Sequence, residues 1–214
     1  MKLPAVLVPL RAALDPIETE PPPGTLRVTV DRMTGARHSA VLVLLFPRGE
    51  DVSFFLTIRP HTLARHAGQI ALPGGAAEPA DRSLWETALR ETHEELGVRT
   101  GSLRPLGRLA SIHVAASNYV IAPYVAWSPA VPAVNPDPGE VAEVFEVPIR
   151  ALLNPASVLE ERWELRGRPV YVCYFHLADR IVWGATARIL ADLARRLGHP
   201  AFEPPLIPGS VRPA

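Results

Sequence analysis

Cysteine is almost absent from this sequence, which holds only Cys173 among its 214 residues. A single cysteine excludes an internal disulfide and a zinc site built from cysteines. Cys173 lies in the apolar stretch Val-Tyr-Val-Cys-Tyr-Phe, so we interpret it as a strand residue of the core. No basic residue adjoins it to activate the thiol, which argues against a catalytic cysteine.

The sequence also lacks an excess of positive charge and any long apolar run. Lys and Arg together number 22, as do Asp and Glu, so nothing indicates binding to nucleic acid. No apolar run reaches the roughly 18 residues that a membrane-spanning helix needs. Met1–Pro4 does not lead into the apolar region of a secretion signal. We therefore expect a cytoplasmic protein whose partner is a small molecule, while the sequence leaves its oligomeric state open, a homodimer included.

Apolar residues are plentiful, at 48% of the chain, which is enough for one domain with a real core. Prolines gather at Pro21–Pro23 and again from Pro200 to Pro213, and such runs are typical of connectors and tails. We predict an N-terminal extension over residues 1–34, packing on or preceding a central domain over 35–198, and a proline-rich tail over 199–214.

Apolar patterning predicts a mixture of strands and helices. The expected strands are Ser39–Phe46, Val52–Ile58, Leu103–Ile112, Tyr119–Trp127, Val158–Leu165 and Val170–Leu177, and Val141–Val147 is expected to begin a strand or a short turn. The expected helices are Pro4–Leu14, broken by Pro9, then Ser83–Gly97, Pro148–Leu153 and Gly184–Leu197. This mixture indicates an α/β fold of the layered α+β kind.

The helix between Ser83 and Gly97 has clear sequence signals at both ends. Ser83 and Glu86 fit a capping box, and Gly97 fits the left-handed position that follows a helix. One core-facing stripe is formed by Trp85, Ala88, Leu89, Thr92 and Leu96. Glu91 and Glu95 fall at the edge of this stripe, where a carboxylate can be held rigidly and still reach a cleft.

Three glutamates on this helix indicate a cation site. Glu94 and Glu95 follow Glu91 by three and four residues, so the carboxylates repel one another on a shared surface, with Glu94 nearer to solvent. Upstream, Gly74 and Gly75 form a turn whose backbone can approach a ligand closely. The Gly75 carbonyl and the three carboxylates would give an all-oxygen site, which suits Mg²⁺ or Mn²⁺. Such a site predicts metal-assisted attack of water on a phosphoanhydride, whereas an isolated glutamate cluster is more often a solvated helix face.

The joint pattern of glycine turn and acidic helix resembles the Nudix box, the signature of the Nudix hydrolase family. Gly75 matches its opening glycine, and its second half is matched by Arg90, Glu91, Glu94, Glu95, Gly97 and Val98. The sequence departs from the family pattern in three ways. Asp81 replaces the usual glutamate, one extra residue separates Asp81 from Arg90, and Thr92 replaces a bulky apolar residue.

This resemblance implies an α/β/α sandwich with a mixed β-sheet, and it implies roles for the matching residues. Glu91 and Glu95 would be the main metal ligands, and Glu94 a further ligand or one that acts through water. Arg90 would orient the glutamates by ion pairing. None of the three departures falls on a position that ligates metal.

The segment before the box resembles the additional motif of the coenzyme A pyrophosphatase branch of this family. The similar segments are Leu56–Arg59, Arg65 and Gly68–Gly75, with Trp183–Leu190 resembling the closing helix of the branch. The resemblance implies hydrolysis of the pyrophosphate bond of coenzyme A, or of an acyl or oxidised form, to 3′,5′-ADP and a phosphopantetheine moiety. Substrate contacts are expected from Arg59, Arg65, Gly68, Gln69, Gly74 and Gly75. Arginine suits phosphate oxygens through its planar fork, and the same loop holds His61 and His66.

The sequence offers several candidates for the general base and for further substrate contacts. Glu140 and Glu143 follow the proline-rich segment Pro129–Pro138 and are candidate bases, although Glu140 is as well explained as an acidic loop residue and Glu143 as a polar strand residue. His113 and Asn118 are candidates for contact with substrate.

The sequence is also compatible with two other functions. A Nudix hydrolase for ADP-ribose, NADH or a dinucleoside polyphosphate would share the box, but the motif over residues 56–75 speaks against it. A catalytically silent binding module with the Nudix fold would be expected to lose at least one box glutamate, whereas this chain has all three.

Overall fold

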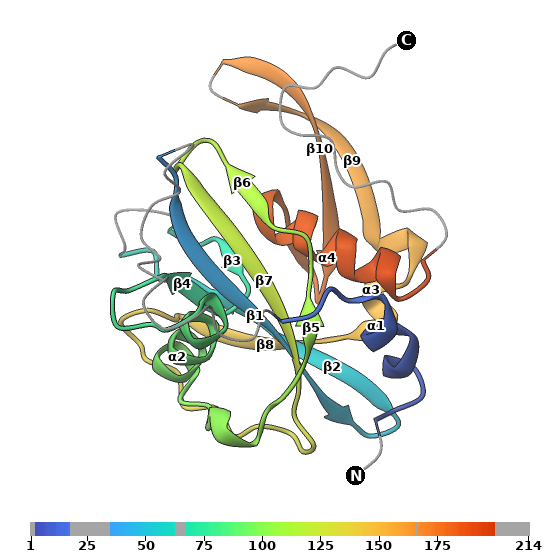
Figure 1. Ribbon diagram of the computed structural model, residues 1–214. Helices are drawn as coiled ribbons and strands as arrows, with labels where there is room; N and C mark the ends of the chain where they lie inside the picture. The colour runs from blue at the N-terminus through green and yellow to red at the C-terminus, as the bar shows by residue number, and fades with distance from the viewer. Residues whose placement is uncertain (1–2, 18–34, 63–66, 166, 200–214) are drawn as a thin grey trace.

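The computed structural model describes residues 3–17, 35–62, 67–165 and 167–199 (Figure 1). In these ranges eight strands form one mixed sheet: β1 Arg37–Arg48, β2 Asp51–Ile58, β3 Ile70–Ala71, β4 Gly74–Ala76, β5 Arg104–Arg108, β6 Ile112–Val114, β7 Tyr119–Trp127 and β8 Glu143–Pro148. The α-helices are α1 Leu7–Ala13, α2 Leu84–Leu96, α3 Ile149–Leu152 and α4 Gly184–Arg196. None of the helices in the described ranges is long and apolar enough to cross a bilayer.

The strand at the centre of the sheet is buried on both faces. Along β1, Leu42 and Leu44 pack in a core with α2, whereas Val43 and Leu45 pack in a second core with α1, α3 and α4. A strand covered on both sides needs apolar residues at successive positions, which explains the unbroken apolar run in the sequence. The layers therefore form an α/β/α sandwich with a mixed sheet, which confirms the predicted fold class (Figure 1).

The sheet opens between β1 and β2, and the glycine turn fills the opening. β1 pairs with β7 along one edge, and its other edge is shared by β2 at residues 45–48 and by β4 at residues 39–41. β3 pairs with the far end of β2, at residues 57–58. The short link between β3 and β4 is fixed there, since the Leu42 N–H donates to the Pro73 carbonyl at 2.9 Å. Strand pairing thus places the glycines in the middle of the sheet, facing α2.

The ends of α2 follow the sequence signals closely. The Ser83 hydroxyl accepts a hydrogen bond from the Glu86 N–H at 3.2 Å, as a helix N-cap does. Gly97 ends the helix with a φ of +65°, and its N–H donates to the His93 carbonyl at 2.8 Å. The reciprocal half of the capping box differs from the prediction, because the Glu86 carboxylate accepts from the N–H of Arg82 at 3.0 Å.

Two predicted elements differ from the structure. The N-terminal helix continues through Pro9, which lies in the first turn, where a helix needs no N–H donor. The strand predicted at Leu103–Ile112 is instead two strands, β5 and β6, that pair with different parts of β7. Within β5 the register also shifts, between Pro105 and Gly107, so this strand is itself irregular.

A second, three-stranded sheet stands beside the first. It consists of β9 Val158–Leu165, β10 Arg168–Leu177 and β11 Arg180–Val182, and Figure 1 shows the β9–β10 hairpin extending beyond the main sheet. The predicted hairpin is confirmed. Cys173 lies in β10 but is only partly buried, and its Sγ donates to the Glu160 carboxylate at 3.6 Å, so it is a strand residue but not a core residue.

Candidate active site

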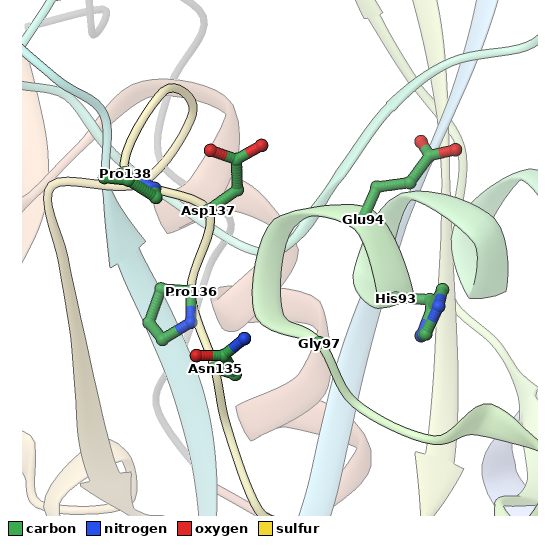
Figure 2. Close-up of a pocket in the computed structure, with 7 residues that line it drawn as sticks. All are labelled: His93, Glu94, Gly97, Asn135, Pro136, Asp137 and Pro138. Carbon is green, nitrogen blue, oxygen red and sulfur yellow. The ribbon is translucent and has the colours of Figure 1, made fainter.

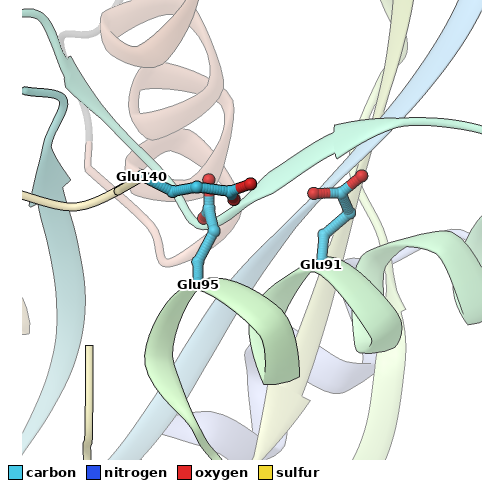
Figure 3. A group of neighbouring side chains, drawn as sticks. All are labelled: Glu91, Glu95 and Glu140. Atoms are coloured by element: carbon cyan, nitrogen blue, oxygen red, sulfur yellow. The ribbon is translucent and has the colours of Figure 1, made fainter. Parts of the chain in front are cut away.

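Three carboxylates from two separate segments converge beside the glycine turn. Glu91 and Glu95 rise from one face of α2, and Glu140 reaches them from the loop before β8 (Figure 3). One oxygen of each carboxylate lies within 4.8 Å of the others. Glu95 is buried, Glu91 is half-buried and Glu140 is exposed, so this carboxylate cluster extends from the protein interior to solvent.

Glu95 is the most deeply buried member of the cluster, with 3% of the residue exposed. Its Oε2 accepts a hydrogen bond from the Gly74 N–H at 3.0 Å, and Nη1 of Arg59 lies 3.6 Å from its Oε1. Burial raises the pKa of Glu95 to about 7, although the Gly74 N–H and the Arg59 guanidinium act in the opposite direction. The positive groups around Glu95 therefore do not fully compensate for the burial of its charge.

Glu91 lies against Gly75, and a side chain at this position would have to displace the Glu91 carboxylate. A Cβ at Gly75 would stand 2.5 Å from the Glu91 carboxylate. Burial raises the pKa of Glu91, and Arg90, whose Nη1 lies 3.1 Å from Oε1, offsets only part of that rise. The glycine thus lets the carboxylate rest directly on the backbone of β4.

Asp81 fixes the arginine that flanks the cluster. Nε and Nη2 of Arg90 donate to the two oxygens of Asp81 at 3.0 and 3.1 Å, and Nη2 also donates to the Ala76 carbonyl at 3.0 Å. The Glu78 N–H and the Thr87 hydroxyl donate to Asp81 at 2.9 and 2.8 Å. Burial raises the pKa of Asp81, but these donors outweigh it and the net effect is a lowered pKa. Asp81 therefore does more than shape a turn, because it holds Arg90 in a bidentate pair.

Replacing Asp81 is expected to weaken the fold around Arg90. In Asp81→Ala, Arg90 and Thr87 lose their acceptor, so we expect the free energy of unfolding to fall by about 2–3 kcal/mol. Urea denaturation measures this loss. Asp81→Asn keeps the shape and one acceptor oxygen and should lose less, and an Asp81→Ala variant as stable as the wild type would contradict this role.

The loop that carries Glu140 is fastened to the C-terminal end of α2. The Asn135 N–H donates to the Leu96 carbonyl at 2.7 Å, and the Asp137 N–H donates to the Glu95 carbonyl at 3.0 Å. The last carbonyls of a helix have no helical donor, so the loop supplies what the helix end lacks. The Glu140 N–H in turn donates to the Asp137 carbonyl at 3.1 Å. Glu140 is thus positioned relative to the helical turn that carries Glu95.

A pocket of about 650 Å³ opens where this loop meets the helix end (Figure 2). It is lined by His93, Glu94, Gly97, Asn135, Pro136, Asp137 and Pro138. A Cβ at Gly97 would stand 2.8 Å from the Asn135 carbonyl oxygen, so glycine here also permits the close approach of the loop. None of the three clustered carboxylates lines the pocket, and we assign it no part in the chemistry.

Two of the predicted acidic residues lie apart from the cluster. The side chain of Glu94 is 50% exposed, and its carboxylate accepts from Nη1 of Arg90 at 2.7 Å. Glu143 begins β8 and pairs with Arg180 at 2.6 Å. Of the two candidate bases, the structure brings Glu140 to the site.

The motif before the box reaches the cluster through Arg59. The Arg59 N–H donates to the Gln69 carbonyl at 3.1 Å, and the Gly68 N–H donates to the Arg59 carbonyl at 3.0 Å. Gly68 faces the ring of His61, which a Cβ at this position would approach to 2.4 Å. Arg65, a further member of the motif, and His66 of the same loop lie outside the described residues.

Sequence reasoning missed Asn135 and Asp137, whose contacts join segments far apart in the chain. The only signal was the proline-rich stretch Pro129–Pro138 just before Glu140, which indicated a loop without saying where the loop docks. His113 and Asn118 were predicted as substrate contacts. The structure places their side chains 3.1 Å from each other, and neither belongs to the carboxylate cluster.

The cluster fits a hard divalent cation. Its three donors are carboxylate oxygens, the ligand type that Mg²⁺ and Mn²⁺ prefer. Burial has raised the pKa of both Glu91 and Glu95, and a cation would stabilise their charged forms. The chemistry of these donors, together with the absence of any side chain at Gly75, makes this the candidate metal centre.

Comparison with known proteins gives consistent matches over most of the chain. A family model described as NUDIX domain matches residues 36–171. A protein of Photorhabdus laumondii subsp. laumondii, named uncharacterized Nudix hydrolase NudL, is 35% identical over 161 residues, which cover 75% of this chain and 85% of that protein. A protein of the same name from Yersinia pestis is 37% identical over 164 residues, covering 75% and 80%.

Solved structures with a related arrangement include the NUDIX domain of Shewanella oneidensis NrtR complexed with ADP ribose. Its TM-score is 0.45 and its sequence identity 20%, over 61% of this chain and 80% of that one.

Proposed function

This chain belongs to the NUDIX domain family and is a Nudix hydrolase, and from that premise we propose that its substrate is coenzyme A. The proposed reaction cleaves the pyrophosphate bond of coenzyme A or its derivatives to 3′,5′-ADP and (acyl-)4′-phosphopantetheine, with Mg²⁺ or Mn²⁺ as the metal. The observation that carries the proposal is the convergence of Glu91, Glu95 and Glu140 at the glycine turn, with Arg59 beside them.

The choice of coenzyme A rests on the segment over residues 56–75, which resembles the motif of the coenzyme A pyrophosphatase branch. Its Arg59 lies 3.6 Å from Glu95, so the motif places a guanidinium at the edge of the cluster. A guanidinium binds phosphate oxygens through two parallel donors, and a pyrophosphate offers several such oxygens. The motif is therefore close enough to hold the group that the reaction cleaves.

Each residue of the cluster has a proposed task. Glu91 and Glu95 would hold the ion, which when bound neutralises phosphate charge and lowers the pKa of water. The Gly74 N–H and Arg90 hold the two glutamates in place, at 3.0 and 3.1 Å. Glu140, the exposed member, would accept the proton of the attacking water.

A side-by-side assay tests this function. Coenzyme A, oxidised coenzyme A, ADP-ribose and NADH are incubated with the protein and Mg²⁺ or Mn²⁺, and products are separated by chromatography. We expect 3′,5′-ADP from coenzyme A, no product in chelator, and no product from Glu91→Gln. Faster turnover of ADP-ribose would favour the alternative of a Nudix hydrolase for another nucleoside diphosphate derivative. Binding of coenzyme A without cleavage in the presence of either metal would instead indicate a silent binding module.

A further inference from the structure

Two arginines lie next to the carboxylate cluster, and they are held very differently. Arg90 donates to both oxygens of Asp81 and to the Ala76 carbonyl, so its guanidinium is anchored independently of the glutamates that it also contacts. Arg59 has one ion pair among the described residues, with Glu95 at 3.6 Å. Arg59 can therefore leave its partner without giving up another contact of this kind, whereas Arg90 cannot.

The backbone of Arg59 is fixed by hydrogen bonds, whereas its side chain is partly exposed. Backbone hydrogen bonds of 3.1 and 3.0 Å tie Arg59 to Gln69 and Gly68 at the end of β2. The side chain is 32% exposed, although its guanidinium reaches a carboxylate that is 4% exposed. The guanidinium thus lies at the boundary between the buried carboxylate and solvent, at the end of a long, flexible stem.

We infer that Arg59 is the counter-ion of Glu95 that a divalent cation replaces, so that metal binding releases the guanidinium to receive a phosphate of the substrate. The inference rests on the proposed function and concerns the same site. The Oε2 atom of Glu95 already accepts the Gly74 N–H at 3.0 Å, whereas Oε1 faces Arg59 at 3.6 Å, so Oε1 is the oxygen with more remaining capacity for a cation. A divalent cation held by that oxygen would repel a guanidinium that stayed beside it.

The direction of release also matches what the substrate needs. Arg59 turns from a buried carboxylate toward solvent, where a pyrophosphate would enter, and an anion there satisfies the guanidinium that the metal displaced. Metal and substrate would therefore favour each other's binding through one side chain. If Arg59 only bound substrate, replacing it would leave the metal affinity unchanged. If Arg59 only supported the fold, replacing it would lower the metal affinity.

The test measures Mn²⁺ binding to the full chain in the absence of substrate, by electron paramagnetic resonance at pH 8.5. In Arg59→Gln the competitor for Glu95 is gone, and we expect Mn²⁺ to bind about three- to tenfold more tightly than in the wild type. The KM for coenzyme A should rise by at least as much. Arg59→Lys keeps the charge but not the fork, so it should raise KM and leave Mn²⁺ affinity near the wild-type value.

Arg48→Gln is the matched control, because Arg48 is an exposed arginine that pairs with Glu146 and with no residue of the cluster. It should change neither Mn²⁺ affinity nor KM. Suppose that the wild-type chain binds Mn²⁺ and cleaves coenzyme A, but Arg59→Gln binds Mn²⁺ no more tightly than the wild type. That result would overturn the inference and leave the proposed function standing. A wild-type chain that binds no Mn²⁺ would overturn the proposed function and the inference together.

A second measurement follows Arg59 itself by nuclear magnetic resonance, in chains that keep this arginine. The Nε–H resonance of Arg59 in the wild-type chain is assigned by its disappearance in Arg59→Lys. We expect this resonance to shift when Mg²⁺ is added without substrate, and to shift again when coenzyme A is added to Glu140→Gln, which the proposed function predicts to be inactive. A resonance that stays unchanged at saturating Mg²⁺ would refute the release of Arg59.

Discussion

Glu95→Gln is expected to reduce metal-dependent hydrolysis by about 10³-fold, which corresponds to roughly 4 kcal/mol of transition-state stabilisation. The amide can still accept the Gly74 hydrogen bond, so the local structure should persist. It cannot supply the negative charge that a hard cation needs, and the most buried donor of the cluster is lost. Initial rates of 3′,5′-ADP formation over a range of Mg²⁺ concentrations measure the effect.

The same substitution should make the metal-free protein more stable above neutral pH. Burial raises the pKa of Glu95 from its ordinary value of 4.5 to about 7. Between these two values the folded chain holds a proton that the unfolded chain has released, so the free energy of unfolding falls as pH rises through this window. With chelator present, urea denaturation at pH 5 and pH 8 should show this fall, by about 2–3 kcal/mol, in the wild type. Glu95→Gln should show a smaller fall, because only the raised pKa of Glu91 still contributes.

Glu94→Gln provides the control for both measurements. Glu94 lies on the same helix, but its side chain is 50% exposed and it pairs with Arg90 outside the cluster. We expect a several-fold loss of turnover at most and no change in the pH dependence of stability. Equal loss of activity in the two variants would mean that Glu94, as the family resemblance implies, is also a ligand of the metal.

Local signals in the sequence were sufficient for the elements that carry the site. The N-cap at Ser83 and the left-handed Gly97 predicted both ends of α2, because each end depends on backbone groups a few residues away. The edge position of Glu91 and Glu95 on that helix followed from its apolar stripe. The structure agrees, with Glu95 buried, Glu91 half-buried and Glu94 exposed.

Contacts between distant segments decided what the sequence left open. Glu140 and Glu143 are both acidic and three residues apart, and nothing local separates them. Glu143 pairs with Arg180, while the Asp137 segment bonds to the end of α2 and leaves Glu140 beside Glu91 and Glu95. No periodic pattern reports such pairings, because they depend on where two segments meet after folding.

The opening in the sheet is a second feature of this kind. The sequence indicated a tight turn at Gly74 and Gly75, but its position between β1 and β2 follows from the registers of four strands. That position brings the turn against Ala40 and Val41 on one side and Glu91 on the other. The two adjacent glycines therefore face different neighbours, and their replacement should have different consequences.

Gly74→Ala is expected to destabilise the fold severely. The φ of Gly74 is +147°, a conformation that alanine rarely adopts, and a Cβ there would stand 2.3 Å from the Ala40 carbonyl oxygen and 2.6 Å from the Val41 Cα. Both are backbone atoms of the central strand, which cannot move aside without disturbing the sheet. We expect the free energy of unfolding to fall by about 3 kcal/mol or more, measured by thermal and urea denaturation.

Gly75→Ala is the matched comparison, and it should act on activity instead. A Cβ at Gly75 meets the Glu91 carboxylate at 2.5 Å, and this is the end of a flexible side chain that can turn away at little cost to the fold. Turning away removes Glu91 from Glu95 and Glu140, so we expect near wild-type stability with a loss of Mn²⁺ affinity and turnover approaching that of Glu91→Gln. If Gly75→Ala kept full activity, the Glu91 carboxylate would not need its place on β4 to bind metal. If Gly74→Ala proved as stable as Gly75→Ala, Gly74 would not lie as close to the backbone of β1 as the structure shows.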